Sequence, residues 1–190
     1  MVVGRFRPGV RGLLGAGALG LAVLGGGCST TVSDIGLFSS DPPPCPAAGT
    51  LIDAATVTEF AGNSTAQSNV RYRAEITRSA FDCSVSGNAV DGTVALIGEV
   101  SLGRRGRAGE ISLPIFVAVT LRDKEVVSKR FDTIELTVDR GQTRANFEKV
   151  IQDFSFNVGS GRKTADYEIL VGFNLTPEQV VYNRKQLDGN

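Results

Sequence analysis

Hydrophobic and polar residues alternate along most of the chain beyond its N-terminal quarter, which is the pattern of half-buried β-strands. The alternation is unbroken over residues 111–121 and 167–175, where an apolar side chain occupies every odd position. Residues 94–102 follow the same rule on even positions, with Gly98 standing in one of them. We therefore predict a strand in each of these segments, and a first strand over residues 50–60.

Three further segments change phase partway, so that their apolar residues switch between odd and even positions. Because such a slip turns every later side chain to the opposite face of the sheet, a β-bulge or a bend is expected at each break. We predict these breaks near Ser79–Ala80 in residues 72–85, near Gln152–Asp153 in residues 145–158, and between Phe131 and Ile134 in residues 125–138.

Residues typical of turns separate the predicted strands. They are Gly62-Asn63, Gly87-Asn88, Asp91-Gly92, Asp123-Lys124, Arg140-Gly141 and Gly159-Ser160-Gly161. About seven strands joined in this way indicate an all-β fold, an antiparallel two-sheet sandwich. In pattern and strand count the chain resembles immunoglobulin and fibronectin type III domains, a likeness of architecture that implies no activity. A closed β-barrel is the alternative arrangement.

One short helix is predicted at the C-terminal end. Thr176 suits the N-cap, Pro177 the first helical position, and Gln179 completes a capping box with Thr176. The helix should run to about Leu187 and pack back on the sandwich.

The N-terminal part has the three sections of a secretory signal peptide. Residues 1–12 are basic, residues 13–24 (LLGAGALGLAVL) are apolar, and small residues follow. The apolar run is shorter than the roughly 20 residues that a membrane-spanning helix needs. We therefore predict a signal peptide over residues 1–27.

The end of this segment, Leu24-Gly25-Gly26-Gly27-Cys28, resembles the lipobox of bacterial lipoproteins. Leu24 stands one position earlier than the aliphatic residue of that family, whereas the small residues and the cysteine match. The resemblance implies cleavage before Cys28 and a lipid anchor on Cys28. Because Ser29 follows the cysteine, it also implies sorting to the outer membrane, facing the periplasm. An ordinary signal peptide with an incidental Cys28 is the alternative.

Cysteine parity adds a second expectation. The chain has three cysteines, an odd count for a secreted protein. If Cys28 carries the lipid, Cys45 and Cys83 are left as a pair, which an oxidising compartment favours as a disulfide. Two free buried thiols are the alternative. Residues 28–44 end in three prolines and predict a Pro-rich tether, and residues 45–190 form the β-sandwich domain.

Composition excludes several chemistries. The sequence contains no histidine, which excludes Ser-His and Cys-His nucleophiles, histidine bases and the usual zinc sites. Of the 20 basic residues three lie in the signal peptide, so 17 basic and 20 acidic residues remain, a charge of about −3. This balance argues against a nucleic-acid partner. We predict no catalytic residue, metal, cofactor or nucleotide site.

One loop is rich in arginine and glycine. Arg104, Arg105 and Arg107 stand among three glycines over residues 103–109. Such a loop can contact anionic lipid head groups, lipopolysaccharide or an acidic partner. The solvated tip of a hairpin is the alternative.

Three further groups of residues are weaker candidates for a functional site. Residues 159–164 (GSGRKT) do not meet the spacing of a phosphate-binding loop and join two strands. Tyr182, Asn183 and Arg184 either pack and cap the last helix or contact a partner. A pair of carboxylates about 5–9 Å apart can hydrolyse a glycoside, against the alternative of solvated strand faces. The candidates for such a pair are Glu59, Glu75, Asp82, Glu99, Asp153, Asp166 and Glu168.

The leading functional hypothesis is a non-enzymatic, membrane-anchored envelope protein that binds or braces another envelope component, with a protein as the expected partner. It follows from the missing catalytic residue types and from the anchor and tether. The alternative is a glycan-binding module or a carboxylate-based glycan hydrolase. The absence of Trp and the three Tyr count against exposed aromatic rows that would bind sugars.

Overall fold

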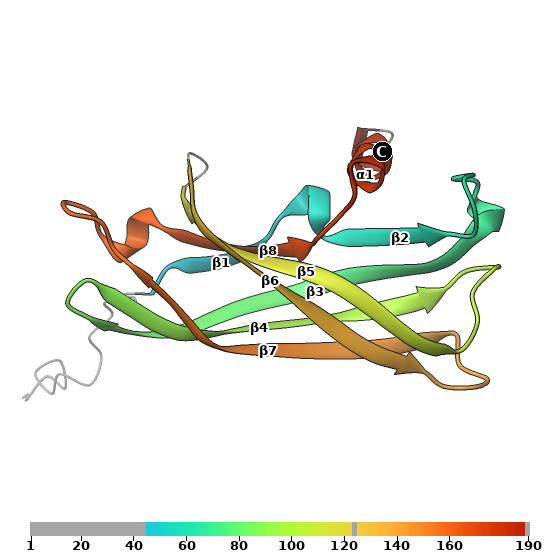
Figure 1. Ribbon diagram of the computed structural model, residues 1–190, viewed down its shortest axis with the longest axis horizontal. Helices are drawn as coiled ribbons and strands as arrows, with labels where there is room; N and C mark the ends of the chain where they lie inside the picture. Colours follow the sequence, from blue (N-terminus) through green and yellow to red (C-terminus); the bar gives the residue numbers. More distant parts are fainter. Residues whose placement is uncertain (1–44, 123–124, 189–190) are drawn as a thin grey trace, which may run out of the picture. The chain divides into compact units, whose positions relative to one another are not determined.

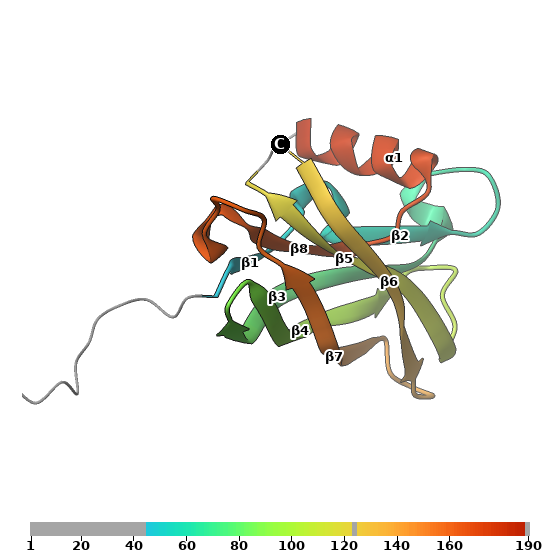
Figure 2. The same cartoon turned by 60° about the vertical axis from the view of Figure 1, so that its left-hand side comes forward.

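The computed structural model describes residues 45–122 and 125–188. The described residues form eight strands in two four-stranded sheets that pack face to face (Figures 1 and 2). The first sheet has the order β1-β8-β5-β6 and the second the order β2-β3-β4-β7. Neighbouring strands are antiparallel except for β1 and β8, which are parallel.

The elements occupy these residues: β1 (Ala47–Thr50), the 3₁₀ turn η2 (Ile52–Ala54), β2 (Thr56–Phe60), the 3₁₀ turn η3 (Gln67–Asn69), β3 (Val70–Ser86), β4 (Ala89–Leu102), β5 (Gly109–Leu121), β6 (Glu125–Val138), β7 (Arg144–Asn157), the 3₁₀ turn η4 (Thr164–Asp166), β8 (Glu168–Phe173) and the helix α1 (Pro177–Asp188).

The predicted two-sheet sandwich with a C-terminal helix is confirmed, and the two sheets do not close into a barrel. The likeness to immunoglobulin domains is one of architecture and not of strand order. In a constant immunoglobulin domain the last two strands are neighbours in one sheet. Here β7 and β8 lie in different sheets, so the chain crosses the sandwich between them.

The predicted first strand, residues 50–60, is in fact two strands in different sheets. The chain leaves β1 of the first sheet, makes the short turn η2, and enters β2 of the second sheet. Ala54 in this turn is buried against the outer face of the first sheet, where it packs with Phe116 and Ala118. Sequence pattern missed the split because this crossing needs only one turn of 3₁₀ helix.

The core lies between the sheets and is built from the alternating residues identified in the sequence. The odd residues of β5 from Ile111 to Leu121 are all buried, as are Val94, Leu96 and Val100 of β4. Two aromatic pairs join the layers: Phe147 with Phe173, at 6.4 Å between ring centroids, and Phe156 with Tyr167, at 5.3 Å.

Three strands carry register shifts, though not all at the predicted sites. The break at Gln152–Asp153 is confirmed, because two residues of β7 face one of β4 there. In β3 one extra residue is Thr77, opposite β4 and two positions before the predicted break, and a second is Arg71, opposite β2. In β6 it is Val127, and the predicted break after Phe131 is wrong.

Two local expectations fail for different reasons. Phe131 faces outward and is 59% exposed, so its hydrophobicity misled the phase analysis. Asp91-Gly92 is not a turn but lies inside β4, since the hairpin between β3 and β4 turns at Gly87-Asn88. The hairpin predicted around Asp123-Lys124 is supported by the pairing of Leu121 with Glu125. Asp123 and Lys124 themselves lie outside the described residues.

The predicted disulfide is present and joins the two sheets at one end. Cys45, just before β1, is bonded to Cys83 of β3 across a sequence separation of 38 residues. A cross-link over a loop of this length stabilises a fold by about 3–4 kcal/mol in the chain-entropy model.

The C-terminal helix begins as predicted and is held by polar contacts. The Thr176 backbone N–H donates to Gln179 Oε1 at 2.9 Å, and the Gln179 N–H donates to Thr176 Oγ1 at 3.3 Å. Buried Asn183 donates from Nδ2 to the carbonyl oxygens of Asp53, at 3.0 Å, and Thr56, at 2.7 Å. The helix is thereby fixed over the crossing from β1 to β2.

The neighbours of Asn183 also pack within the domain. Arg184 Nε lies 2.9 Å from Asp53 Oδ2, and the Tyr182 ring packs edge-on against Phe60 at 5.1 Å. For all three residues the packing interpretation is therefore supported.

Gly98 supplies a stability prediction. It is an inward position of β4 beneath the Phe147 ring, and an added methyl group would collide with that ring and with the Glu75 carbonyl oxygen. We expect Gly98→Ala to lower the free energy of unfolding by about 1–3 kcal/mol in urea denaturation, the usual cost of overpacking. Gly49→Ala is the matched control, because its methyl group would meet no atom closer than 3.8 Å. Equal effects of the two changes would contradict the packing argument.

A second stability prediction concerns Asn183, which binds the helix to the crossing from β1 to β2. Asn183→Ala leaves two carbonyl oxygens under the helix without their donor, so we expect a loss of about 1–3 kcal/mol in the free energy of unfolding. Arg184→Gln removes only a partly exposed ion pair and should cost less than about 1 kcal/mol. Thermal unfolding of the two variants tests this order, and a larger loss for Arg184→Gln would refute it.

Candidate functional site

The arginine-rich loop is not a hairpin tip, because it carries the chain from β4 in the second sheet to β5 in the first. Its backbone is bound to the start of β3. The Gly103 N–H donates to the Arg71 carbonyl and the Arg105 N–H to the Val70 carbonyl, both at 2.9 Å. A side chain at Gly103 or Gly106 would collide with these same two carbonyl groups. The glycines thus permit a close approach that fixes the position of the loop.

A cleft of about 490 Å³ opens beside this loop, at the end of the sandwich where β2 ends and β3 and β5 begin. Arg105 and Arg107 line it, whereas Arg104 does not. The other lining residues come from β2, β3, β4, the loop and β5: Glu59, Arg71, Tyr72, Leu102, Gly106, Glu110, Ile111 and Ser112. The volume lies in the range of small-molecule sites, about 300–1,000 Å³.

Three guanidinium groups and two carboxylates therefore share one cleft. Within residues 45–122 and 125–188, no hydrogen bond or ion pair engages the side chains of Arg71, Arg105 or Arg107. Of the carboxylates, Glu59 accepts a long hydrogen bond of 3.4 Å from Gln179 Nε2. The planar guanidinium groups of these arginines are therefore available to bind a carboxylate or phosphate through two parallel N–H hydrogen bonds.

Tyr72 forms part of the cleft wall and packs partly against the core. Burial raises the pKa of its hydroxyl above the ordinary value, the charge of Glu59 raises it further, and Arg71 opposes the shift. The hydroxyl is therefore protonated at neutral pH and is available as a hydrogen-bond donor.

Arg71 and Tyr72 were missed at the sequence level. They stand more than thirty positions before the loop, in a strand whose pattern indicated only alternation. The antiparallel pairing of β3 with β4, in which Tyr72 faces Leu102, and the backbone bonds from the loop to the start of β3 place them beside Arg105, and no local motif signals this.

The carboxylates proposed as a possible hydrolytic pair do not gather in the cleft. Of that set only Glu59 lines it. Glu75 and Glu99 are partners in register across β3 and β4, on the outward side of the second sheet, and Arg144 Nη1 lies 3.7 Å from Glu99 Oε1. Asp166 accepts the Lys163 backbone N–H at 2.8 Å and so begins η4. These positions favour a structural or solvated role.

The glycine-rich segment 159–164 joins β7 to β8, as expected, and wraps around a buried tyrosine. The Gly159 N–H donates to the Tyr167 hydroxyl at 2.8 Å, and the side chain of Tyr167 is almost fully buried. The segment leads into a short 3₁₀ turn and not into a helix that could receive a phosphate.

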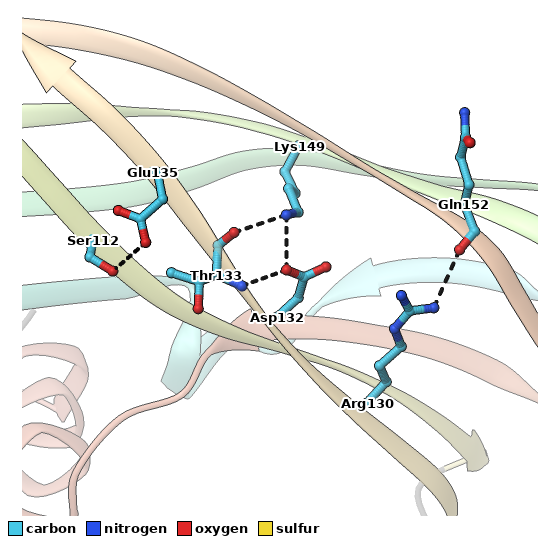
Figure 3. Close-up of polar contacts among 7 residues, drawn as sticks. All are labelled: Ser112, Arg130, Asp132, Thr133, Glu135, Lys149 and Gln152. Atoms are coloured by element: carbon cyan, nitrogen blue, oxygen red, sulfur yellow. Dashed lines mark hydrogen bonds and ion pairs between the residues drawn. The ribbon is translucent and has the colours of Figure 1, made fainter.

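A second polar cluster bridges the sheets along their open side, where the edge strands β6 and β7 face each other (Figure 3). Lys149 Nζ lies 2.8 Å from Asp132 Oδ1 and donates to the Thr133 carbonyl at 2.9 Å. Arg130 donates to the Gln152 carbonyl at 3.3 Å. Inward-pointing charges of this kind discourage edge strands from pairing with other chains. We regard this cluster as structural.

The described residues offer neither a metal site nor a membrane-spanning helix. No three of the described His, Cys, Asp or Glu side chains are grouped so that they could hold a metal ion. Among the same residues, no helix has both the length and the apolar character to span a membrane. Cys28, the signal peptide and the tether lie outside the described residues.

Comparison of the chain with protein-family models, with curated proteins and with solved structures finds no match. The case for function therefore depends on the geometry of the domain and on the N-terminal sequence.

The Asp132–Lys149 pair predicts a pH dependence. The hydrogen bond from Lys149 lowers the pKa of Asp132, and the Thr133 N–H and nearby cations lower it further, against the opposing effect of burial. A lowered carboxylate pKa stabilises the fold above the ordinary value of about 3.9, and this stabilisation is lost as the pH falls through the lowered value. Asp132→Asn should thus cost up to about 1 kcal/mol at neutral pH and progressively less below about pH 4.

Urea denaturation at neutral pH and near about pH 3 measures this difference. In a double-mutant cycle with Lys149→Gln, the coupling between the two changes should be present at neutral pH and reduced in acid. A coupling that does not change with pH would contradict the role assigned to the pair.

Proposed function

We propose that the protein is a non-enzymatic lipoprotein of the bacterial cell envelope. Cys28 carries the lipid in the outer membrane, residues 28–44 form the tether, and the sandwich domain in the periplasm binds or braces a second envelope component. The lipobox-like end of the N-terminal segment supports the anchor. The Cys45–Cys83 disulfide supports an oxidising compartment, since such bonds persist in the periplasm and are rare in the cytosol.

The observation that carries the bracing role is the position of the cleft relative to the entry of the chain. Cys45 stands just before β1 and is bonded to Cys83 near the end of β3, whereas the backbone of the β4–β5 loop is bound to the start of β3. The start and the end of β3 lie at opposite ends of the sandwich (Figure 1). Both ends are joined by β3, which covers about 35 Å from Tyr72 to Cys83 at about 3.3 Å per residue. A domain held at one end and equipped to bind at the other can connect two components.

The cleft itself supports binding more than catalysis. Its charged side chains are arginines and glutamates at the surface, and its arginines are free to receive an anionic group. Backbone hydrogen bonds fix the position of the loop that carries Arg105 and Arg107, which reduces the backbone entropy lost on binding.

The glycan-binding alternative also has one specific observation in its favour. The cleft combines arginines with Glu59, Glu110 and the Tyr72 hydroxyl, a mixture able to bind charged and hydroxyl groups together. Binding of this kind does not require a row of exposed aromatic side chains.

The first experiment is the intact mass of the mature protein taken from its native membrane. We expect a lipid-modified chain that begins at Cys28 and gains two hydrogen atoms on reduction of the disulfide. Cys28→Ser should yield a chain without lipid that is released from the membrane. A wild-type mass without lipid would overturn the anchor.

The bracing role is tested by site-directed photo-crosslinking of the same lipidated protein in intact cells. A photoreactive residue at Arg104, in the loop beside the cleft but outside its lining, should give a defined adduct with an envelope component, whereas one at Asn88, at the opposite end of β3, should not. Equal adducts at both positions would contradict a cleft directed at a partner.

A further inference from the structure

We propose that the cleft binds a sugar residue that carries both an anionic group, carboxylate or phosphate, and free hydroxyl groups. The second envelope component would then be an acidic glycan. This inference rests on the proposed function, because it names the component that the anchored domain binds.

The arginines define the anionic part of the ligand. Arg71 comes from β3, whereas Arg105 and Arg107 come from the β4–β5 loop, so the three guanidinium groups reach the cleft from two separate segments. None of the three forms a side-chain hydrogen bond or ion pair within the described part of the chain. Arginine recognises carboxylate and phosphate through paired N–H donors, and bonds of this kind are among the stronger ones in proteins.

The acidic side chains define the rest of the ligand. Glu59 and Glu110 line the same cleft but form no ion pair with these arginines. A purely anionic ligand would be repelled by both carboxylates, whereas a sugar can donate its hydroxyl groups to them. The Tyr72 hydroxyl provides one further donor for a ligand oxygen.

The apolar residues of the cleft are consistent with a ring of sugar size. Leu102 and Ile111 contribute to its wall, and Ile111 belongs to the core of the sandwich. The space of about 490 Å³ accommodates a short saccharide, and its open side allows a longer chain to continue out of it.

The test is a calorimetric titration of the mature lipidated protein in detergent with four probes. They are an oligogalacturonate, a neutral oligoglucoside of equal length, a phosphorylated hexose and polyglutamate. We expect saturable binding of the acidic sugars and none of the neutral one, and the two acidic probes distinguish a carboxylate from a phosphate. Polyglutamate bound as tightly as the sugars would overturn the proposal, because charge alone would then explain binding.

Two variants and one matched control make the test specific. Arg105→Gln should weaken binding of the acidic sugar by about tenfold or more, since it removes charge-assisted hydrogen bonds. Arg104→Gln removes the same charge from the same loop but does not line the cleft, and it should leave the affinity within about twofold. Equal losses in both variants would overturn the site.

Glu59→Gln separates recognition of the sugar from attraction of its charge. The change should weaken binding of the acidic sugar, because a charged hydroxyl acceptor is replaced by a weaker, neutral amide oxygen, but should leave or strengthen binding of polyglutamate, because a repelling charge is gone. Tighter binding of the sugar would overturn the role of Glu59. If no probe binds while the intact mass shows the lipid and the Arg104 crosslink forms, the ligand class fails and the anchored bracing function stands.

Discussion

The packing of two sheets against each other, at a separation of about 10 Å, is the constraint on which the rest of this domain depends. The inward residues of β4 and β5 fill that space, and these two strands are consecutive in the chain although they lie in different sheets. The loop between them must therefore span the thickness of the sandwich. It does so with its backbone bound to β3, and the end of the domain is left open beside it as a lined cleft.

The same constraint explains why some of the fold was predictable from sequence and some was not. A buried inner face demands an apolar residue at every second position, so β4, β5 and β8 could be located from local pattern alone. That pattern does not show which strands pair with one another. Residues 50–60 were expected to be one strand, because the exchange of sheets at Ala54 needs only a short turn and a small buried side chain.

Outward hydrophobic residues were the second source of error. Phe131 lies on the outer face of β6, where Lys129 Nζ stands 5.0 Å from the centre of its ring, and its apolar character suggested a break that the strand does not have. The residues of the candidate site were likewise predictable only where they are close together in the sequence. Arg105 and Arg107 were visible as a local cluster, whereas Arg71 and Tyr72 join them only through the pairing of β3 with β4.

The disulfide at the start of the domain has a mechanical consequence. β1 is a four-residue edge strand, and a pull on the chain before it would, without a cross-link, peel this strand from β8 one hydrogen bond at a time. Because Cys45 is bonded to Cys83, the load passes instead into β3, which pairs with β4 from Tyr72 to Ser86 and with β2 near its start. Force along the long axis of the domain then meets many hydrogen bonds in shear together, which makes the sandwich a stiff strut between its two ends.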